Sequence, residues 1–222
     1  MKDIRHWYDG WFYENFIAAN QDVMFEAIME IVNPNSSILD VGCGTGRMAY
    51  ILINKYKSYT GIDLSSKNIK SATDSFSSLQ DERIKFWHKN IEAIVKEKRK
   101  YNYSIMTYVL HEIELSERIP TLYNMLKVSD SVIIGDYHLP SQKKWQDRFN
   151  EIVEFIAGRD HYRNYKSYIK QGGLKGIVES AKLKIEIEIK NSPITSHIIK
   201  ISKTSIELDS NSYVISGKCC QF

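Results

Sequence analysis

Gly42, Gly44 and Gly46 alternate with other residues at the end of the apolar run Ser37–Val41. Glycine has no Cβ and readily takes positive φ, so the chain can turn sharply there and a ligand can lie against the backbone. The residues from Met48 to Lys55 predict a helix, whose first N–H groups would face an anionic part of that ligand. A strand, a glycine turn and a helix in this order are typical of α/β nucleotide-binding units.

A second short strand is predicted over Tyr59–Asp63, about twenty residues after the glycine turn. It ends in an acid followed by Leu64 and two serines. In α/β nucleotide-binding units a carboxylate at this place binds the ribose hydroxyls. Asp63 is therefore the predicted ribose-binding residue.

The motif ILDVGCGTG, followed by GIDLS, resembles the class I S-adenosylmethionine (SAM)-dependent methyltransferases over residues 36 to 137. The turn reads G-x-G-x-G instead of the dinucleotide pattern G-x-G-x-x-G, and Asp40 stands two residues before its first glycine. This combination favours SAM over NAD. The resemblance implies that the glycine turn lies along the methionyl part of the cofactor and that Asp40 helps to hold its amino group.

The resemblance also points to the end of the third strand for the adenine, where Asn90 stands in place of the family's usual acid. An amide can both donate to and accept from the adenine edge. Asparagine also favours helix N-caps, and both roles can hold together. The residues predicted to bind SAM are Asp40, Gly42, Cys43, Gly44, Gly46, Asp63, Leu64, Asn90, Ile91 and Tyr108.

Few catalytic side chains are expected, because the resemblance implies that the cofactor supplies the reactive carbon. His111 follows the fourth strand at the cofactor rim and is a candidate base, since imidazole titrates near neutral pH. His161 and Tyr8 are candidate substrate or cofactor contacts. The alternatives are a helix-start role for His111, with a bond to a backbone carbonyl, and simple packing for the other two.

Strand and helix patterns alternate from residue 37 to 136, which predicts a parallel sheet covered by helices. The segment Leu183–Lys190 instead alternates strictly between apolar and charged residues, and the apolar segments 198–206 and 213–216 follow it. The predicted fold is therefore α/β, a Rossmann-like, doubly wound, mostly parallel seven-stranded sheet with an antiparallel C-terminal hairpin. The segment 213–216 would be one strand more than the resemblance requires.

Length predicts a single methyltransferase-like domain over residues 1–222. Two aromatic-rich segments are extra to its core, residues 1–30 and the insert 141–173 after the fifth strand. Ligands of doubly wound sheets bind beyond the carboxyl ends of the strands, so both segments are predicted lids over that crevice.

Composition excludes several classes of protein. A net charge of +3 is too small to indicate nucleic-acid binding, and the basic run Lys96–Lys100 has neither an aromatic platform nor a second basic cluster beside it in the sequence. Three cysteines and six scattered histidines form no disulfide framework and no metal motif, so no metal ligands are predicted. The chain has no signal core or membrane span, which favours the cytoplasm and excludes stable membrane insertion.

The predicted function is SAM-dependent transfer of a methyl group to an oxygen or nitrogen of a small-molecule substrate. Base-flipping methylation is disfavoured because no Asn-Pro-Pro-Tyr or Asp-Pro-Pro-Tyr motif follows the fourth strand. One alternative is a lipid or quinone headgroup at a membrane surface, suggested by Trp7, Trp11 and Phe12. Others are a SAM-binding protein without catalysis and an NAD-dependent dehydrogenase. The sequence leaves the oligomeric state open.

Overall fold

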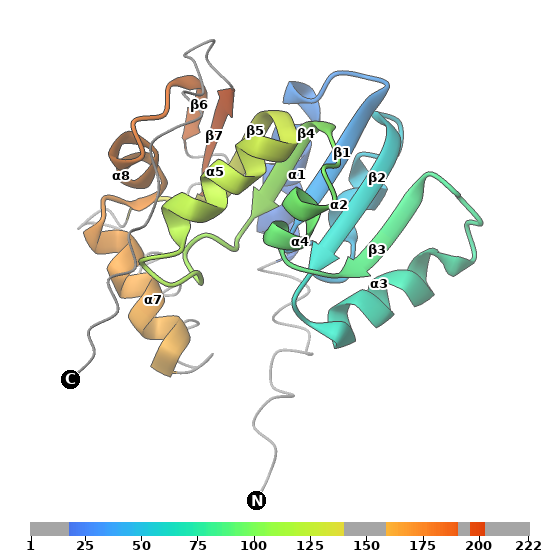
Figure 1. Ribbon diagram of the computed structural model, residues 1–222, viewed down its shortest axis with the longest axis horizontal. Coiled ribbons are helices and arrows are strands. Elements are labelled where there is room, and N and C mark those ends of the chain that lie inside the picture. The colour runs from blue at the N-terminus through green and yellow to red at the C-terminus, as the bar shows by residue number, and fades with distance from the viewer. Residues whose placement is uncertain (1–17, 140–158, 191–195, 203–222) are drawn as a thin grey trace, which may run out of the picture.

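The computed structural model describes residues 18–139, 159–190 and 196–202. It contains one seven-stranded sheet with the strand order β3-β2-β1-β4-β5-β7-β6. Neighbouring strands from β1 to β5 pair in parallel, whereas β7 pairs antiparallel with both β5 and β6. This arrangement confirms the predicted α/β fold with its antiparallel C-terminal hairpin (Figure 1).

The strands are β1 (Ser36–Val41), β2 (Tyr56–Asp63), β3 (Ile84–His88), β4 (Tyr101–Thr107), β5 (Ser129–Tyr137), β6 (Ile185–Lys190) and β7 (Ser196–Ser202). The helices are α1 (Ala18–Ile31), α2 (Arg47–Ile51), α3 (Ser66–Ser77), α4 (Ile91–Lys96), α5 (Arg118–Val128), α7 (Arg159–Lys170) and α8 (Gly173–Ser180).

Each face of the sheet has its own hydrophobic core, as a doubly wound sheet requires. One core joins the sheet to α4, α5 and α8 through residues such as Leu122, Met125 and Ile177. The other joins it to α1, α2 and α3 through residues such as Ile28 and Phe76. The sheet is therefore held from both sides, which leaves the ends of its strands to form sites.

Helix α1 packs directly on the middle of the sheet. A Cβ added to Gly135 of β5 would lie 2.3 Å from the sulfur of Met24, so the absence of a side chain at Gly135 admits this methionine. Met24 and Ile28 have no exposed surface. Residues 18–31, partly inside the predicted N-terminal lid, thus belong to the core, while residues 1–17 lie outside the described part.

The strand order reverses direction at β1, which lies between β2 on one side and β4 on the other. Ligands of doubly wound sheets bind beyond the carboxyl ends of the strands at such a point. Asp40 of β1 stands beside Gly61 of β2 and Ile105 of β4 at this place. The fold therefore directs attention to the loops that follow β1, β2 and β4.

Two predicted elements differ in extent from those observed, and one helix was not predicted. The sequence pattern predicts a fourth strand from Tyr103 to Leu110, but β4 ends at Thr107, and Tyr108 takes a φ of 54°. The helix expected over 48–55 is the short α2, after which the chain turns toward β2. Helix α8 was not predicted, although its buried Leu174, Ile177 and Val178 follow helical spacing.

The C-terminal strand β7 begins two residues before its predicted start at 198. The segment 213–216 and residues 140–158 of the predicted insert lie outside the described part of the chain. In the described ranges, no helix combines the length and apolar character needed to cross a membrane.

Candidate functional site

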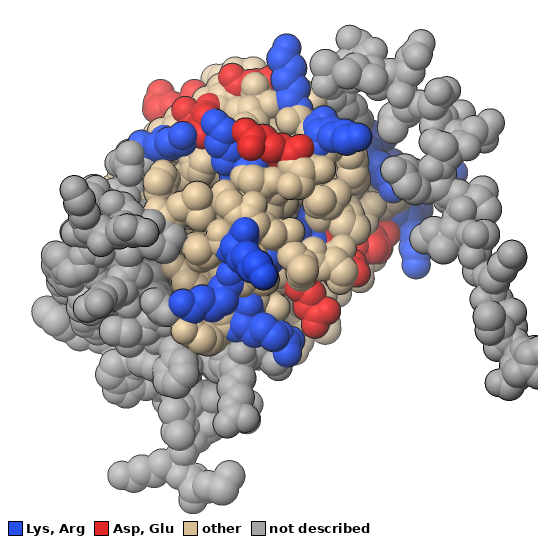
Figure 2. Space-filling model, turned by 90° about the vertical axis from the view of Figure 1, so that its left-hand side faces the viewer, with Lys and Arg blue, Asp and Glu red and all other residues tan. Residues whose placement is uncertain are grey.

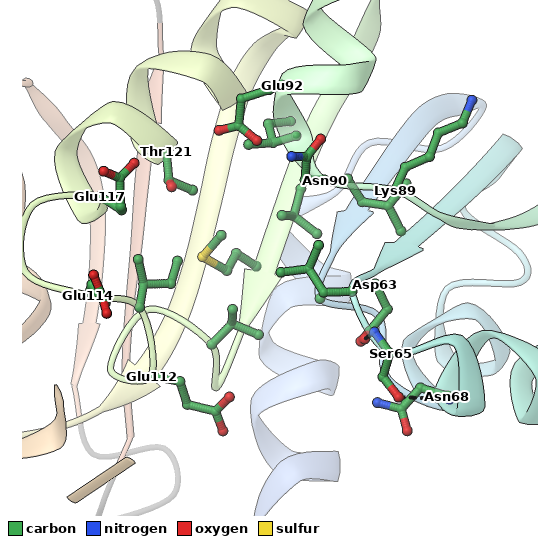
Figure 3. Close-up of a pocket in the computed structure, with 18 residues that line it drawn as sticks. Asp63, Ser65, Asn68, Lys89, Asn90, Glu92, Glu112, Glu114, Glu117 and Thr121 are labelled. Atoms are coloured by element: carbon green, nitrogen blue, oxygen red, sulfur yellow. Dashed lines mark hydrogen bonds between the residues drawn. The ribbon is translucent and has the colours of Figure 1, made fainter. Parts of the chain in front are cut away.

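A cavity of about 750 Å³ opens at the carboxyl ends of β1, β2 and β4. Its size lies within the range of small-molecule and cofactor sites. Figure 3 shows Asp63 and Asn68 on one side of it and Glu112, Glu114 and Glu117 on the other. The cavity therefore lies at the place where the fold predicts a ligand.

The glycine loop contributes to the wall of this cavity, and two of its glycines have different surroundings. Gly42, which lines the cavity, has a φ of +76°, and a Cβ there would lie 2.5 Å from a methyl group of Val109. Gly44 has a φ of +53°, but an added Cβ would meet no atom of the described residues within 4 Å. The loop thus packs tightly against the turn after β4 at Gly42 and leaves free space at Gly44.

Several amides of the glycine loop donate hydrogen bonds within the protein. The amides of Gly42 and Cys43 donate to the carbonyl of Ile62, and that of Gly46 donates to the carbonyl of Cys43. The Cys43 side chain is buried, and burial raises the pKa of its thiol. These bonds fix the shape of the loop and leave its outer surface to meet a ligand.

Asp63 connects the glycine loop to the next helix. Its Oδ2 accepts a hydrogen bond from the Gly44 amide at 2.9 Å, and its Oδ1 accepts one from the Ser65 amide at 2.7 Å. Ser65 is in turn the N-cap of α3, where its side chain accepts from Asn68. Each carboxylate oxygen of Asp63 has a second lone pair for a ligand hydroxyl. Its place in the cavity wall agrees with the predicted ribose contact.

Asp40 lies behind the loop and not in the cavity wall. Its side chain is buried, and the Tyr59 hydroxyl donates to its Oδ2. Burial raises the pKa of Asp40 to about 7, and the Asp63 carboxylate adds to this shift. Its Oδ1 has no hydrogen-bond partner among the described residues. A buried polar atom of this kind calls for a further partner, such as a ligand or water.

Asn90 combines the two roles considered for it. It is the N-cap of α4, and its Oδ1 accepts from the Ala93 amide at 3.0 Å. It also lines the cavity together with Ile91 and Leu64. Leu64 is 75% exposed, so its apolar surface is available to a ligand in the cavity. The three residues are suited to the faces and edge of a planar ring.

The cavity carries a strongly negative lining. Its charged members are Lys89 and five acids, and the Lys89 ammonium is already paired with Glu97. A concave site lined by charges of one sign attracts ligands of the opposite sign. The acids are Asp63, Glu92, Glu112, Glu114 and Glu117. This lining suits a ligand that carries a positive charge.

Tyr108 stands beside the cavity and holds the turn after β4. Its amide donates to the carbonyl of Gly135 at 2.8 Å, and its hydroxyl lies 2.8 Å from the Ser196 hydroxyl. A positive φ is uncommon for a bulky residue and often marks a functional site. Burial raises the pKa of Tyr108 to about 12, so its hydroxyl keeps its proton at neutral pH.

His111 forms a buried pair with Asp136, so the predicted alternative of a bond to a backbone carbonyl is not what fixes its ring. Its Nδ1 lies 2.6 Å from Asp136 Oδ1, and its backbone amide donates to Asp136 Oδ2 at 3.0 Å. The rings of Tyr137, Tyr165 and Tyr168 surround the imidazole. When Nδ1–H donates its hydrogen bond to the Asp136 carboxylate, the other ring nitrogen, Nε2, can accept a proton.

Glu112 connects His111 and His161. Its Oε1 lies 3.8 Å from Nε2 of His111 and 3.9 Å from Nδ1 of His161, and Glu112 itself lines the cavity. His161 is half exposed on α7, and neither histidine is part of the cavity wall. Two of the three predicted catalytic candidates therefore meet at one glutamate, while Tyr8 lies outside the described residues.

Helix α7 presents opposite characters on its two faces. Tyr165 and Tyr168 are buried toward His111, whereas Arg163, Lys166 and Lys170 are exposed. Figure 2 views the molecule from the side of α7 and α8 and shows basic side chains gathered there. Helical spacing of the tyrosines accounts for their place in the core.

Two groups around His111 were not predicted in these roles. The sequence at the end of the fifth strand predicts that Asp136, Tyr137 or His138 faces the substrate, whereas Asp136 is buried and paired with His111. Arg118, which is fully buried, was not considered. A signal for Arg118 was present, since it stands three and four residues before Thr121 and Leu122 on the buried stripe of α5. Among the residues that the structure describes, no group of three or more potential ligands could hold a metal ion.

Residues 38–131 match a family model described as a methyltransferase domain. The chain is 28% identical over 155 residues to the phosphoethanolamine N-methyltransferase of Plasmodium falciparum, covering 66% of this chain and 57% of that protein. Its fold matches the magnesium protoporphyrin IX methyltransferase of Synechocystis PCC 6803 with bound SAM, at a TM-score of 0.61, 16% identity and coverage of 91% and 90%. Residues 38–131 are thus similar to methyltransferase domains, and the chain has the fold of class I SAM-dependent methyltransferases.

The chain also shares its fold with the N-methyltransferase NodS of Bradyrhizobium japonicum WM9, at a TM-score of 0.56, 12% identity and coverage of 85% and 98%. It spans 57% of the length of its curated Plasmodium relative. The match therefore concerns the catalytic fold and not the whole of that protein.

SAM is bound in the Synechocystis neighbour, and the cavity of this chain suits SAM in three respects. The free space at Gly44 admits a ligand against the loop, and the acidic lining suits a sulfonium cation. Asp40 offers a buried oxygen without a partner among the described residues, close to the loop. The matches and the cavity agree with the predicted resemblance and with SAM as the ligand.

Proposed function

We propose that this protein transfers a methyl group from SAM to a nitrogen or oxygen of a small-molecule acceptor, with His111 as the base. The observation that carries this proposal is the buried pair of His111 and Asp136, which lies behind Glu112 of the cavity wall. A histidine fixed by a carboxylate at one nitrogen can receive a proton at the other.

The cofactor's place follows from the cavity wall. Gly42 and Gly44 would lie along the methionyl part, Asp63 would accept from the ribose hydroxyls, and Asn90 and Leu64 would contact the adenine. SAM supplies an electrophilic methyl group when it is bound. The protein's own contribution is to align the acceptor, to exclude water and to remove a proton.

His111 is held for this last task from two directions. Asp136 accepts from both the ring and the backbone amide of His111, so the imidazole cannot turn without losing two hydrogen bonds. Its Nε2 faces Glu112, which forms part of the cavity. An acceptor that reaches Glu112 would therefore place its ammonium or hydroxyl proton near Nε2.

An amine acceptor is supported by charge and by resemblance. Glu112, Glu114 and Glu117 line the part of the cavity opposite Asp63, and carboxylates stabilise an ammonium group (Figure 3). The name of the Plasmodium relative specifies transfer to a nitrogen of phosphoethanolamine. We therefore expect amines to be better acceptors than alcohols. A small acceptor agrees with the size of the cavity and with a cytoplasmic enzyme.

The test uses methyl-labelled SAM, the purified protein and a panel of small amines and alcohols, with labelled products identified by mass spectrometry. A labelled amine supports the proposal. Labelling of carbon alone, of a lipid headgroup alone, or of no acceptor while SAM still binds would contradict it. The last outcome would favour a SAM-binding protein without catalysis.

Two variants separate the base from the cofactor site. His111→Gln is expected to lower kcat by about 10² or more, because it removes the base, and to leave the Kd for SAM nearly unchanged. Asp63→Asn is expected to raise the Kd for SAM. Equal turnover in His111→Gln and the wild type would show that His111 is not the base.

A further inference from the structure

Arg118 is a buried cation with no obvious part in the hydrophobic core. It is the first residue of α5, and none of its surface is exposed. Taking a guanidinium out of water is costly, and an apolar residue of similar size would stabilise such a position as well or better. The hydrogen bonds that it forms therefore need an explanation beyond stability.

These hydrogen bonds join two segments that lie far apart in the sequence. In the turn after β4, the guanidinium donates to the carbonyl of Leu110 at 3.2 Å and reaches that of His111 at 3.5 Å. In α7 it donates to the carbonyl of Asn164 at 2.7 Å and to the Ser167 hydroxyl at 2.8 Å.

Further contacts extend this connection. The guanidinium donates to the side-chain oxygen of Gln171, just after α7, at 2.5 Å, and it lies over the ring of Tyr168. The Asn164 side chain donates to the carbonyl of Glu112 at 2.7 Å, and the Tyr168 hydroxyl donates to that of Tyr137. The turn that carries His111 and the helix that carries His161 are thus connected through one planar group.

The geometry of arginine matters for this arrangement. All the acceptors are neutral oxygens, and they are reached by Nε, Nη1 and Nη2. The five N–H donors of arginine lie in one fixed plane, whereas lysine offers a single ammonium at the end of a flexible chain. Lysine would keep the charge and lose most of the simultaneous contacts.

We propose that Arg118 is a positioning residue that couples the placement of α7 to that of the His111 turn. The effect of Arg118 on catalysis rests on the proposed role of His111 as the base. Asp136 fixes the imidazole from β5, while Arg118 fixes the carbonyls of the same turn from α5 and sets the distance to α7. The proposed base His111 and helix α7 are therefore held in a fixed position relative to each other.

The first test measures hydrogen exchange in the cofactor-free protein. In Arg118→Lys, the amides of residues 108–112 and 161–171 are expected to lose protection together, while those of β1 and β2 keep it. Arg83→Lys is the matched control, because Arg83 is exposed and paired with Asp81. Unchanged protection, loss in only one of the two segments, or equal loss across the whole sheet would overturn the proposal.

The second test measures kinetics with the acceptor found in the labelling experiment. Arg118→Lys is expected to lower kcat by about tenfold or more, because small misplacements of reacting groups are costly, and to change the Kd for SAM by less than about twofold. A variant with wild-type kcat, or one that loses SAM affinity in proportion to kcat, would contradict positioning.

Two milder variants keep the proposal testable if Arg118→Lys does not fold. Ser167→Ala and Gln171→Ala each remove one partner of the guanidinium on the α7 side, so they are expected to loosen both segments to a smaller extent. Loosening of α7 alone would contradict the coupling. If the wild type transfers no methyl group, the proposed function fails, but hydrogen exchange still decides whether Arg118 couples the segments.

Discussion

Asp40, behind the glycine loop, makes the stability of the folded protein depend on pH. Its carboxyl is buried, and burial raises its pKa from 3.8 to about 7. The folded protein therefore binds this proton more tightly than the unfolded chain does. The stability that the protonated form provides is complete below about pH 4 and is lost as the pH rises to about 7.

Asp40→Asn is expected to remove this pH dependence, because an amide stays neutral. Near pH 8 the cofactor-free variant should unfold at a higher temperature than the wild type, with an upper limit of about 4 kcal/mol in the free energy of unfolding. The two proteins should converge near pH 4. Thermal unfolding followed by circular dichroism from pH 4 to 8 measures the difference, and parallel curves would contradict the shifted pKa.

Asp63→Ala is expected to weaken SAM binding by tenfold or more, since it removes the predicted ribose contact and two hydrogen bonds that shape the loop. Hydrogen bonds to a charged group contribute about 1.5–3 kcal/mol each. Titration calorimetry measures the Kd, and Asp74→Asn on the exposed face of α3 is the control. Unchanged affinity in Asp63→Ala would place the ribose elsewhere.

Among the elements, α4 is short and depends on its cap. Asn90→Ala is expected to cost about 1 kcal/mol of stability, because the amide of Ala93 loses its acceptor, whereas Asn90→Asp keeps the cap. If Asn90 also contacts the adenine, the alanine variant should bind SAM more weakly than the aspartate variant does. Chemical denaturation and calorimetry measure the two effects, and equal SAM affinity in both variants would leave Asn90 as a cap alone.

The features that could be predicted from the sequence are those that a local pattern encodes. The alternating charges of β6 and the glycine loop after β1 are local signals, and both are found where they were expected. The pairing of His111 with Asp136 and the burial of Arg118 depend on residues 25 to 53 positions apart. No local pattern encodes such contacts, so the glycine loop and Asp63 could be named from the sequence, whereas His111 was named without its partners.

At the scale of the whole molecule, SAM is expected to stabilise the fold by mass action. A ligand at 100 times its Kd adds about 2.7 kcal/mol, which corresponds to a rise in Tm of roughly 5–10 °C for a chain of this size. NADH at the same concentration should leave Tm unchanged. Differential scanning calorimetry makes the comparison, and a rise with NADH instead of SAM would overturn the assignment of the cofactor.

The place of β7 within the sheet has a consequence for biosynthesis. It is the last described strand, yet it lies between β5 and β6, and its isoleucines belong to the cores on both faces. A nascent chain that has emerged from the ribosome only as far as β6 would lack the strand that joins β6 to β5. Ribosome-bound intermediates would thus expose an unpaired edge of β5 until residue 202 is available.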